Sequence, residues 1–231
     1  MNKIQVKSNG KSFSVYIRDD ADESVAAEIF DKHEYRIADD IIKSATDPII
    51  DIGSHAGFFS LYVRTLNENV PILAIEPEPN NIDQLSRHLK ENNIKSIKVV
   101  AGAVAADAGR RHLVVSKDSH NHYLLNREDV KTQNSTIVNT WSLPELLKKS
   151  IIDNVSLVKM DIEGGEYEVF EGLKIEDLAK IKAFIIEYHL DGGKKYQVIE
   201  NNLRVNGFGV QIMPSKFDKK MGFIFAVNKR K

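Results

Sequence analysis

Residues 51–59 read DIGSHAGFF, and this stretch decides the fold that the sequence predicts. The apolar run that ends in Asp51 and Ile52 is typical of a buried strand, and residues 57–69 are typical of a helix. We expect Gly53 to form a tight turn between them and Gly57 to permit close packing or a close approach of the backbone. Backbone N–H groups at the start of that helix are then expected to face a polar ligand.

The rest of the chain alternates short apolar runs with amphipathic stretches. Expected strands cover residues 48–53, 71–77, 96–105, 155–162, 183–190, 207–214 and 222–228, and expected helices cover residues 57–69, 79–93 and 194–203. This alternation predicts a three-layer, doubly wound, mostly parallel α/β sheet of the Rossmann-like kind, with helices on both faces. The last two strands are too close in sequence for a helical crossover. We therefore expect about seven strands with an antiparallel C-terminal strand.

Two segments read differently. In residues 1–47, two alternating runs flank Asn9-Gly10, which predicts a β-hairpin, and residues 23–44 predict one or two helices. We expect residues 1–47 to form a hairpin and helical cap packed on a main domain of residues 48–231. Between residues 106 and 140 the pattern is weak, with an extra strand at 110–116 and a mobile loop at 117–135 as the expectation.

The amino-acid composition limits the classes of binding partner that the protein is expected to have. The 231 residues carry 32 basic and 33 acidic side chains, so the net charge of -1 gives no electrostatic support for a nucleic-acid partner. No apolar run approaches the roughly 20 residues that span a bilayer, and the first residues have no secretory pattern. Cysteine is absent, which excludes disulfides and thiolate catalysis. We expect a cytoplasmic protein without a membrane partner, either a monomer or a homodimer.

The first turn also bears on the ligand, since doubly wound sheets bind ligands at the carboxyl ends of their strands. A dinucleotide site favours G-x-G-x-x-G, whereas this turn reads G-S-H-A-G and has Asp51 two residues before its first glycine. That carboxylate would repel a pyrophosphate but suits S-adenosylmethionine, which carries a sulfonium and no phosphate. Glu76, 25 residues after Asp51, is expected at the end of the second strand, where a carboxylate accepts from ribose hydroxyls.

A second motif points to a family. Residues 159–172, KMDIEGGEYEVFEG, follow the pattern K-x-D-x-E-G-x-E-x-x-V-x-x-G. Together with DIGSHAGFFSLY, AIEPEPNNIDQL, GAVA and FIIEYH, this motif resembles the FkbM family of S-adenosylmethionine-dependent O-methyltransferases, which have the class I methyltransferase fold. The resemblance covers about residues 48–190. It implies methyl transfer to a hydroxyl, typically of a sugar or a small metabolite.

The resemblance also implies positions for a cofactor. Asp51, Gly53 and Gly57 would shape the pocket for the methionine end, and Glu76 would bind the ribose. Further lining residues are expected at Ser54, His55, Phe58, Pro77, Ala103, Val104 and Asp161, with Ala103 and Val104 beside the adenine. His55 departs from the pattern, because such turns more often carry a small residue or an asparagine.

Four polar side chains are expected to carry the chemistry: Asp161 and Glu163 at the end of the fourth strand, and Glu187 and His189 at the end of the fifth. In one mechanism His189 is the general base that removes the hydroxyl proton, oriented by Glu187 or Asp161. In the other, Asp161, Glu187 and His189, with or without Glu163, bind a divalent metal ion that acidifies the hydroxyl. The metal-free mechanism is favoured, so no metal ligand is assigned.

Several alternatives stay open at this point. Glu163 and Glu166 flank Gly164-Gly165 where a helix begins, so either carboxylate would equally cap that helix. His120 and His122 are second candidates for a base, and His88 is expected at the surface. An RNA methyltransferase and a nucleoside-cofactor-binding protein without methyl transfer are the alternative functions.

Overall fold

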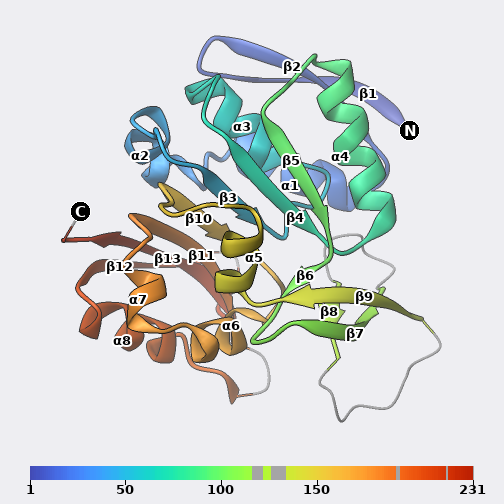
Figure 1. The fold of residues 1–231 in the computed structure, drawn as a ribbon. Helices are drawn as coiled ribbons and strands as arrows, with labels where there is room; N and C mark the ends of the chain where they lie inside the picture. Colours follow the sequence, from blue (N-terminus) through green and yellow to red (C-terminus); the bar gives the residue numbers. More distant parts are fainter. Residues whose placement is uncertain (116–121, 126–133, 191–192, 217, 231) are drawn as a thin grey trace.

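The computed structural model describes residues 1–115, 122–125, 134–190, 193–216 and 218–230 (Figure 1). Its main sheet has seven strands in the order β12-β13-β11-β10-β3-β4-β5. The strands are β3 (Ile49–Ile52), β4 (Ile72–Glu76), β5 (Ile97–Ala101), β10 (Leu157–Met160), β11 (Ala183–His189), β12 (Phe208–Pro214) and β13 (Met221–Asn228). β13 runs opposite to the other six strands of this sheet and pairs antiparallel with both β11 and β12. The predicted doubly wound sheet with an antiparallel C-terminal strand is therefore confirmed.

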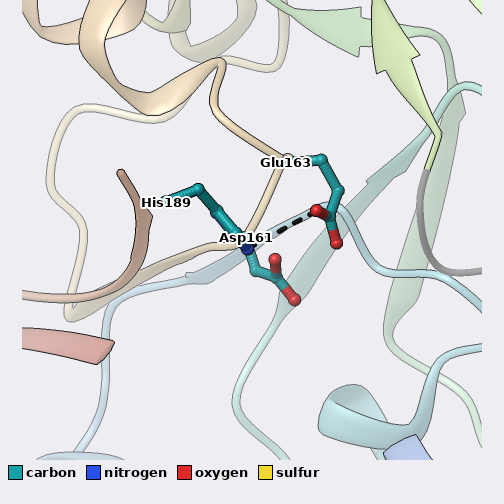
Figure 2. Close-up of side chains that lie close together, drawn as sticks. All are labelled: Asp161, Glu163 and His189. Atoms are coloured by element: carbon teal, nitrogen blue, oxygen red, sulfur yellow. Dashed lines mark ion pairs between the residues drawn. The ribbon is translucent and has the colours of Figure 1, made fainter. Parts of the chain in front are cut away.

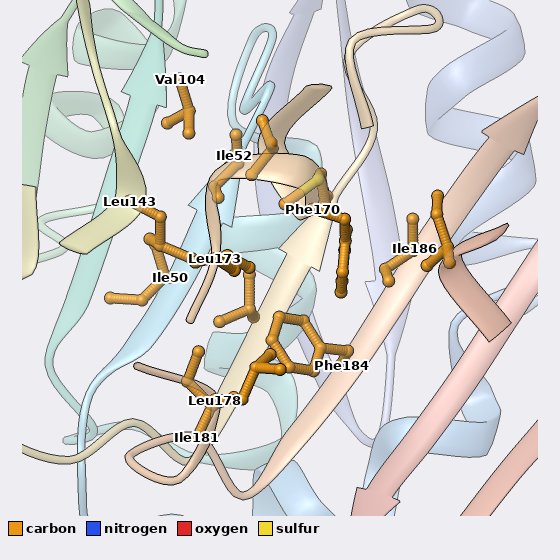
Figure 3. Packing of buried hydrophobic residues seen from close by; sticks show 14 of the residues in the cluster. Ile50, Ile52, Val104, Leu143, Phe170, Leu173, Leu178, Ile181, Phe184 and Ile186 are labelled. Atoms are coloured by element: carbon orange, nitrogen blue, oxygen red, sulfur yellow. The ribbon is translucent and has the colours of Figure 1, made fainter. Parts of the chain in front are cut away.

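Helices cover both faces of this sheet. They are α3 (Phe58–Leu66), α4 (Pro79–Glu91), α5 (Leu143–Lys149), α6 (Glu166–Gly172), α7 (Ile175–Leu178) and α8 (Gln197–Val205). Successive strand residues point to opposite faces, so Ile50 belongs to the cluster that contains Phe170 of α6, while Ile49 belongs to the cluster that contains Phe59 of α3. Figure 3 shows the first cluster, in which Phe170 and Phe184 pack together. Burial on both faces explains why these strands are continuous apolar runs.

The N-terminal segment consists of β1 (Asn2–Ser8), β2 (Lys11–Ile17), α1 (Asp20–Phe30), a 3₁₀ turn (Arg36–Ala38) and α2 (Asp39–Lys43). The β1–β2 hairpin is confirmed, with Asn9 and Gly10 both at positive φ in its turn. Val15 and Phe30 share a hydrophobic cluster with residues of α3. The segment is thus packed against the helical layer on one face of the sheet, while a domain boundary at residue 47 stays a prediction.

His88 of α4 lies beneath this hairpin, and its predicted surface position is wrong. The side chain is fully buried, and its Nε2 accepts a hydrogen bond of 2.9 Å from the backbone N–H of Tyr16. Its Nδ1 lies 2.8 Å from the carbonyl oxygen of Ala56, so Nδ1 carries the proton and donates it. His88 therefore joins the hairpin to the first turn of the main sheet.

A second sheet was not foreseen. It has the order β6-β9-β7-β8 and contains β6 (Ala103–Val104), β7 (Gly109–Val114), β8 (Tyr123–Leu124) and β9 (Ser135–Trp141). The prediction of a single strand at 96–105 is wrong, because the segment divides at Gly102 into β5 and β6. Gly102 has a φ of +151°, and a Cβ there would lie 2.2 Å from the ring of Trp141. Of the loop predicted at 117–135, residues 123–124 form β8, and residues 117–121 and 126–133 lie outside the described residues.

None of the helices in the described part of the chain combines the length and the hydropathy that crossing a membrane requires.

Candidate active site

A cavity of about 620 Å³ opens at the carboxyl ends of β3, β4, β10 and β11. Most of the residues that the sequence singled out line it: Gly53, Ser54, His55, Phe58, Glu76, Pro77, Ala103, Val104, Asp161, Glu163 and Glu187. Asp51, Gly57 and His189 are not among its lining residues. The structure thus brings together residues from five separate stretches of sequence, at the place where doubly wound sheets bind ligands.

The first turn is shaped by its two glycines. Gly53 has a φ of +72°, and a Cβ there would lie 1.8 Å from the carbonyl oxygen of Asp161, so only glycine fits between β3 and the turn after β10. Gly57 has a φ of +83°, and its Cβ would lie 2.9 Å from Leu85 Cγ, which places its role in the packing of α3 on α4. The N–H groups of Gly53 and Ser54 both donate to the carbonyl of Ile75 at 3.0 Å, so they do not face a ligand.

Asp51 already faces a cation of the protein. Its fully buried carboxylate accepts a 2.7 Å hydrogen bond from Ser60 Oγ and lies 3.7 Å from Lys159 Nζ. Burial raises the pKa of Asp51, and Lys159 and Ser60 partly offset that rise. Lys159 also donates to the carbonyl of Gly53 at 2.8 Å and lies 3.7 Å from Asp161. Contact between Asp51 and a cofactor stays a prediction, whereas its pairing with Lys159 is an observation.

Glu76 ends β4, and its carboxylate is held from three sides. The backbone N–H groups of His55 and Glu78 donate to it at 2.8 and 2.9 Å, and Asn81 Nδ2 donates at 3.2 Å. Burial raises the pKa of Glu76 to about 7, although these hydrogen bonds act in the opposite direction. The carboxylate therefore has a fixed orientation, faces the cavity and changes its charge near neutral pH.

The second acidic group lies in the turn after β10. β10 ends at Met160, two residues before the predicted end of the strand, so Asp161 and Glu163 lie in the turn that follows it. Glu163 adopts a left-handed φ of 54° in the turn that leads from β10 into α6. Figure 2 shows Asp161, Glu163 and His189 converging; each offers one ligand atom within 4.8 Å of the others.

His189 lies between two carboxylates. Its Nε2 is 3.5 Å from Glu163, and its Nδ1 is 3.3 Å from the buried Glu166. Although burial lowers the pKa of His189, these carboxylates and Asp161 raise it to about 10. Glu166 also accepts from the N–H groups of Ile162 and Gly164, so it both closes the turn before α6 and holds His189. A histidine that keeps its proton at neutral pH is disfavoured as the general base.

The carboxylates beside it have unusual acidities. Burial and the charge of Asp161 raise the pKa of Glu163 to about 8, with His189 acting in the opposite direction. The same two causes raise the pKa of Glu187 well above its ordinary value. Burial and neighbouring like charges thus make Glu163 and Glu187 stronger proton acceptors than they would be in water.

Sequence reasoning missed several cavity residues. Tyr35 of the N-terminal segment is buried, packs on Phe59 and Phe223, and lines the cavity. Its pKa is raised well above the ordinary value by burial and by the charges of Glu187 and Asp161. A single tyrosine in an amphipathic stretch gives no signal of such a place. His122, which the sequence did suggest as a second candidate for the base, lines the cavity as well, whereas His120 lies outside the described residues.

Known proteins are similar to this chain in sequence or in fold. The sequence is 27% identical over 213 residues to the methyltransferase sdnD of Sordaria araneosa, covering 79% of this chain and 80% of that protein. It is 26% identical over 143 residues to the hexuronic acid methyltransferase AglP of Haloferax volcanii, covering 62% of this chain and 56% of that protein. The methyltransferase FkbM of Methylobacillus flagellatus has a similar fold, with a TM-score of 0.55 over 91% of this chain and 55% of that one, at 13% identity.

Membership of a family is shown by a match to a family model over most of the chain. A family model for the methyltransferase FkbM domain matches residues 51–213, a range that runs from the first glycine turn through the acidic turn after β10 into β12. This range includes every one of the predicted residues named above that line the cavity. The chain therefore belongs to the FkbM methyltransferase family.

Proposed function

We propose that the protein is an S-adenosylmethionine-dependent O-methyltransferase that acts on a hydroxyl of a small molecule or a sugar. One observation carries the proposal. A carboxylate at the end of β4 and a group of carboxylates after β10 and in β11 line the same cavity. The carboxylate at the end of β4 can accept hydrogen bonds from ribose hydroxyls, and the carboxylates after β10 and in β11 can accept the proton of an acceptor hydroxyl. A nucleoside cofactor and an acceptor would therefore bind in the same cavity.

On the cofactor side, Glu76 is the acceptor for the ribose hydroxyls. Gly53, Ser54 and His55 form the wall beside the methionine end, and Ala103 and Val104 form an apolar surface for the adenine. When bound, the cofactor supplies an electrophilic methyl group on a sulfonium. The chain must align the acceptor oxygen in line with that methyl group and exclude water from the path.

On the acceptor side, we assign proton removal to a carboxylate. Glu187 lines the cavity and its pKa is raised well above the ordinary value, by burial first and by Asp161 second. The bound cofactor would supply the methyl group, and its sulfur would keep the electron pair of the carbon–sulfur bond. The ionised form of Glu187 would accept the proton that the acceptor hydroxyl loses, so activity should rise with pH as Glu187 ionises. His189, which holds its own proton between Glu163 and Glu166, would fix the position of Glu163. This assignment replaces His189 as the expected base.

A divalent metal ion is the second candidate for activating the hydroxyl. Two carboxylates and one imidazole, from Asp161, Glu163 and His189, offer ligand atoms within 4.8 Å of one another. Such a donor set fits Mn²⁺, Fe²⁺ or Zn²⁺ better than Mg²⁺, which prefers oxygen ligands alone. A bound ion would lower the pKa of a coordinated hydroxyl. Turnover that is lost in EDTA and restored by one of these ions would favour this mechanism over the metal-free one.

The acceptor class rests on weaker support. One relative is named a hexuronic acid methyltransferase, which is consistent with a sugar. An RNA acceptor is disfavoured by the net charge of -1, because RNA binding generally relies on an excess of basic side chains.

Isothermal titration calorimetry tests the cofactor. S-adenosylmethionine, S-adenosylhomocysteine and NAD would be titrated into the wild-type protein and into Glu76→Ala. We expect the first two to bind and the substitution to weaken them at least tenfold, since a charged hydrogen-bond acceptor is lost. Binding of NAD alone would contradict the proposal. Binding without methyl transfer to a broad panel of hydroxyl acceptors would instead indicate a protein that only binds the cofactor.

A further inference from the structure

Arg18 follows the hairpin and lies outside the segment that the family match covers. Its guanidinium forms a two-pronged contact with the fully buried Asp22, with Nε donating at 2.8 Å and Nη2 at 2.7 Å. The backbone N–H of Arg18 donates to the same carboxylate at 2.9 Å. Asp22 is itself fixed, because its backbone N–H donates to Asp19 at 3.0 Å. The guanidinium therefore has a single orientation.

From this position Arg18 reaches a residue of α4. Its Nη2 donates to Asn81 Oδ1 at 2.8 Å, and Asn81 Nδ2 donates in turn to Glu76 Oε1 at 3.2 Å. Arginine has only donors, so it forces the amide of Asn81 to present its oxygen to Arg18 and its NH₂ group to Glu76. The reverse orientation would set an amide oxygen against a carboxylate oxygen. Arg18 thus decides which end of Asn81 meets Glu76.

Among these three hydrogen bonds to Glu76, the one from Asn81 depends on the orientation of a side chain. The other two donors to Glu76 are backbone N–H groups, at His55 and Glu78, whose directions are set by the chain. Asn81 supplies the side-chain donor, and it is almost completely buried. The same guanidinium nitrogen lies 3.3 Å from His55 Nε2, a residue that lines the cavity. The N-terminal segment therefore acts on two neighbouring parts of the cofactor wall.

We propose that Arg18 is a positioning residue for the cofactor: through the Asn81 amide it sets the orientation in which Glu76 meets the ribose hydroxyls. This inference rests on the proposed function, in which Glu76 binds the ribose. It gives the N-terminal segment a part in cofactor binding in addition to its packing role. Asn81 is the intermediate of the relay, and Asp22 is its anchor.

The test compares two ligands on matched variants by calorimetry. S-adenosylhomocysteine can donate its ribose hydroxyls to Glu76, whereas its 2′,3′-dideoxy analogue cannot. Arg18→Lys keeps a cation beside the buried Asp22 but lacks the planar fork that also reaches Asn81. We expect Arg18→Lys to weaken S-adenosylhomocysteine about tenfold and to leave the dideoxy analogue within about twofold, because only the hydroxyl contact is lost.

Two further variants make the result decisive. Asn81→Asp keeps the shape of the side chain and its contact with Arg18 but sets a carboxylate against Glu76, so the same selective loss is expected. Lys7→Gln changes the charge of an exposed residue in β1 and is expected to change neither affinity. Thermal unfolding would confirm that each variant is folded. If Arg18→Lys fails to fold, Asn81→Asp decides alone.

The possible failures are distinguishable. If the wild-type protein does not bind S-adenosylhomocysteine, the proposed function and this inference both fall. If it binds but Glu76→Gln leaves the affinity unchanged, Glu76 does not bind the ribose, and this inference falls while cofactor binding stands. If Glu76→Gln weakens binding but Arg18→Lys and Asn81→Asp weaken both ligands equally or neither, only the inference falls, and Arg18 has a structural role alone.

Discussion

Gly53 and Gly10 allow two effects of a glycine substitution to be measured separately. One is backbone strain from a positive φ, and the other is steric crowding of the added Cβ. Gly53 and Gly10 have similar φ angles of +72° and +76°, but a Cβ at Gly53 would lie 1.8 Å from Asp161 O, whereas Gly10 has nothing within 4 Å. We expect Gly10→Ala to lower the free energy of unfolding by about 1 kcal/mol, from backbone strain alone. Gly53→Ala should cost about 4 kcal/mol or more, because β3 and the turn after β10 must separate.

Urea unfolding of both variants measures the difference. Equal losses at the two positions would show that the close approach of Gly53 to Asp161 is not required for stability. A loss at Gly53 together with unchanged cofactor binding would show that the turn tolerates the separation.

Glu76 makes cofactor binding depend on pH. Its pKa is about 7 in the folded protein against 4.5 for an ordinary glutamate, so the folded state holds the proton between these values. The free protein accordingly loses stability as the pH rises from about 4.5 to about 7. Ribose hydroxyls donate to the ionised carboxylate, so the affinity for S-adenosylhomocysteine should instead increase between about pH 6 and about pH 8. Calorimetry across this range measures it, and Glu76→Gln should remove most of the dependence. An unchanged profile in that variant would assign the titration to another group.

At the scale of elements, His88 attaches the hairpin to the sheet domain. Burial lowers the pKa of His88, so its neutral form, which accepts from Tyr16, is favoured in the folded state. Because a base with a lowered pKa binds fewer protons when folded, its contribution is complete above about pH 6.5 and is lost as the pH falls below that value. We expect faster amide hydrogen exchange in β1 and β2 at about pH 5 than at pH 7, after correction for intrinsic rates.

His88→Gln provides the control for this prediction. Glutamine has an acceptor near the position of the imidazole Nε2 but does not titrate in this range. The exchange rates of its hairpin should therefore lose most of their pH dependence. Equal acid sensitivity in the variant and the wild-type protein would locate the effect elsewhere in the hairpin interface.

Burial distinguishes the strands that the sequence pattern predicts from those that it misses. Strands such as β3 and β10 are buried on both faces, so each is an unbroken apolar run that period and length identify. In β9 the pattern is misleading, because Ile137 is exposed while Thr140 is buried. Partners distant in sequence carry no local signal at all: Tyr16 meets His88 across 72 residues, and Arg18 meets Asn81 across 63. The strand ends of the site were therefore predictable, whereas the side chains that position them were not.

For the whole molecule, the distribution of charge matters more than its total. The net charge is -1, yet the described lining of the cavity is strongly acidic. Its carboxylates are Glu28, Glu34, Glu76, Asp161, Glu163, Glu168, Glu171 and Glu187, against the basic side chains Arg111, Lys159, Lys194 and Lys195. Arg111 is already paired with Glu168, and Lys159 with Asp51 and Asp161. At a pH above about 8, where Glu76 and Glu163 are ionised, an acceptor therefore enters a field that repels anions.

This field predicts a preference between two otherwise matched sugars, a glycoside with a hydroxymethyl group and the corresponding uronate. In EDTA we expect kcat/KM to be at least about tenfold higher for the neutral sugar, and the ratio should shrink as salt screens the cavity. With Mn²⁺ added, an ion held by Asp161, Glu163 and His189 would attract the uronate and reduce or reverse the preference. Efficient methylation of the uronate in EDTA would contradict the electrostatic argument. An unchanged preference with Mn²⁺ would count against a metal ion at this cluster, because a bound cation in a low-dielectric cavity cannot leave the affinity for a carboxylate unaltered.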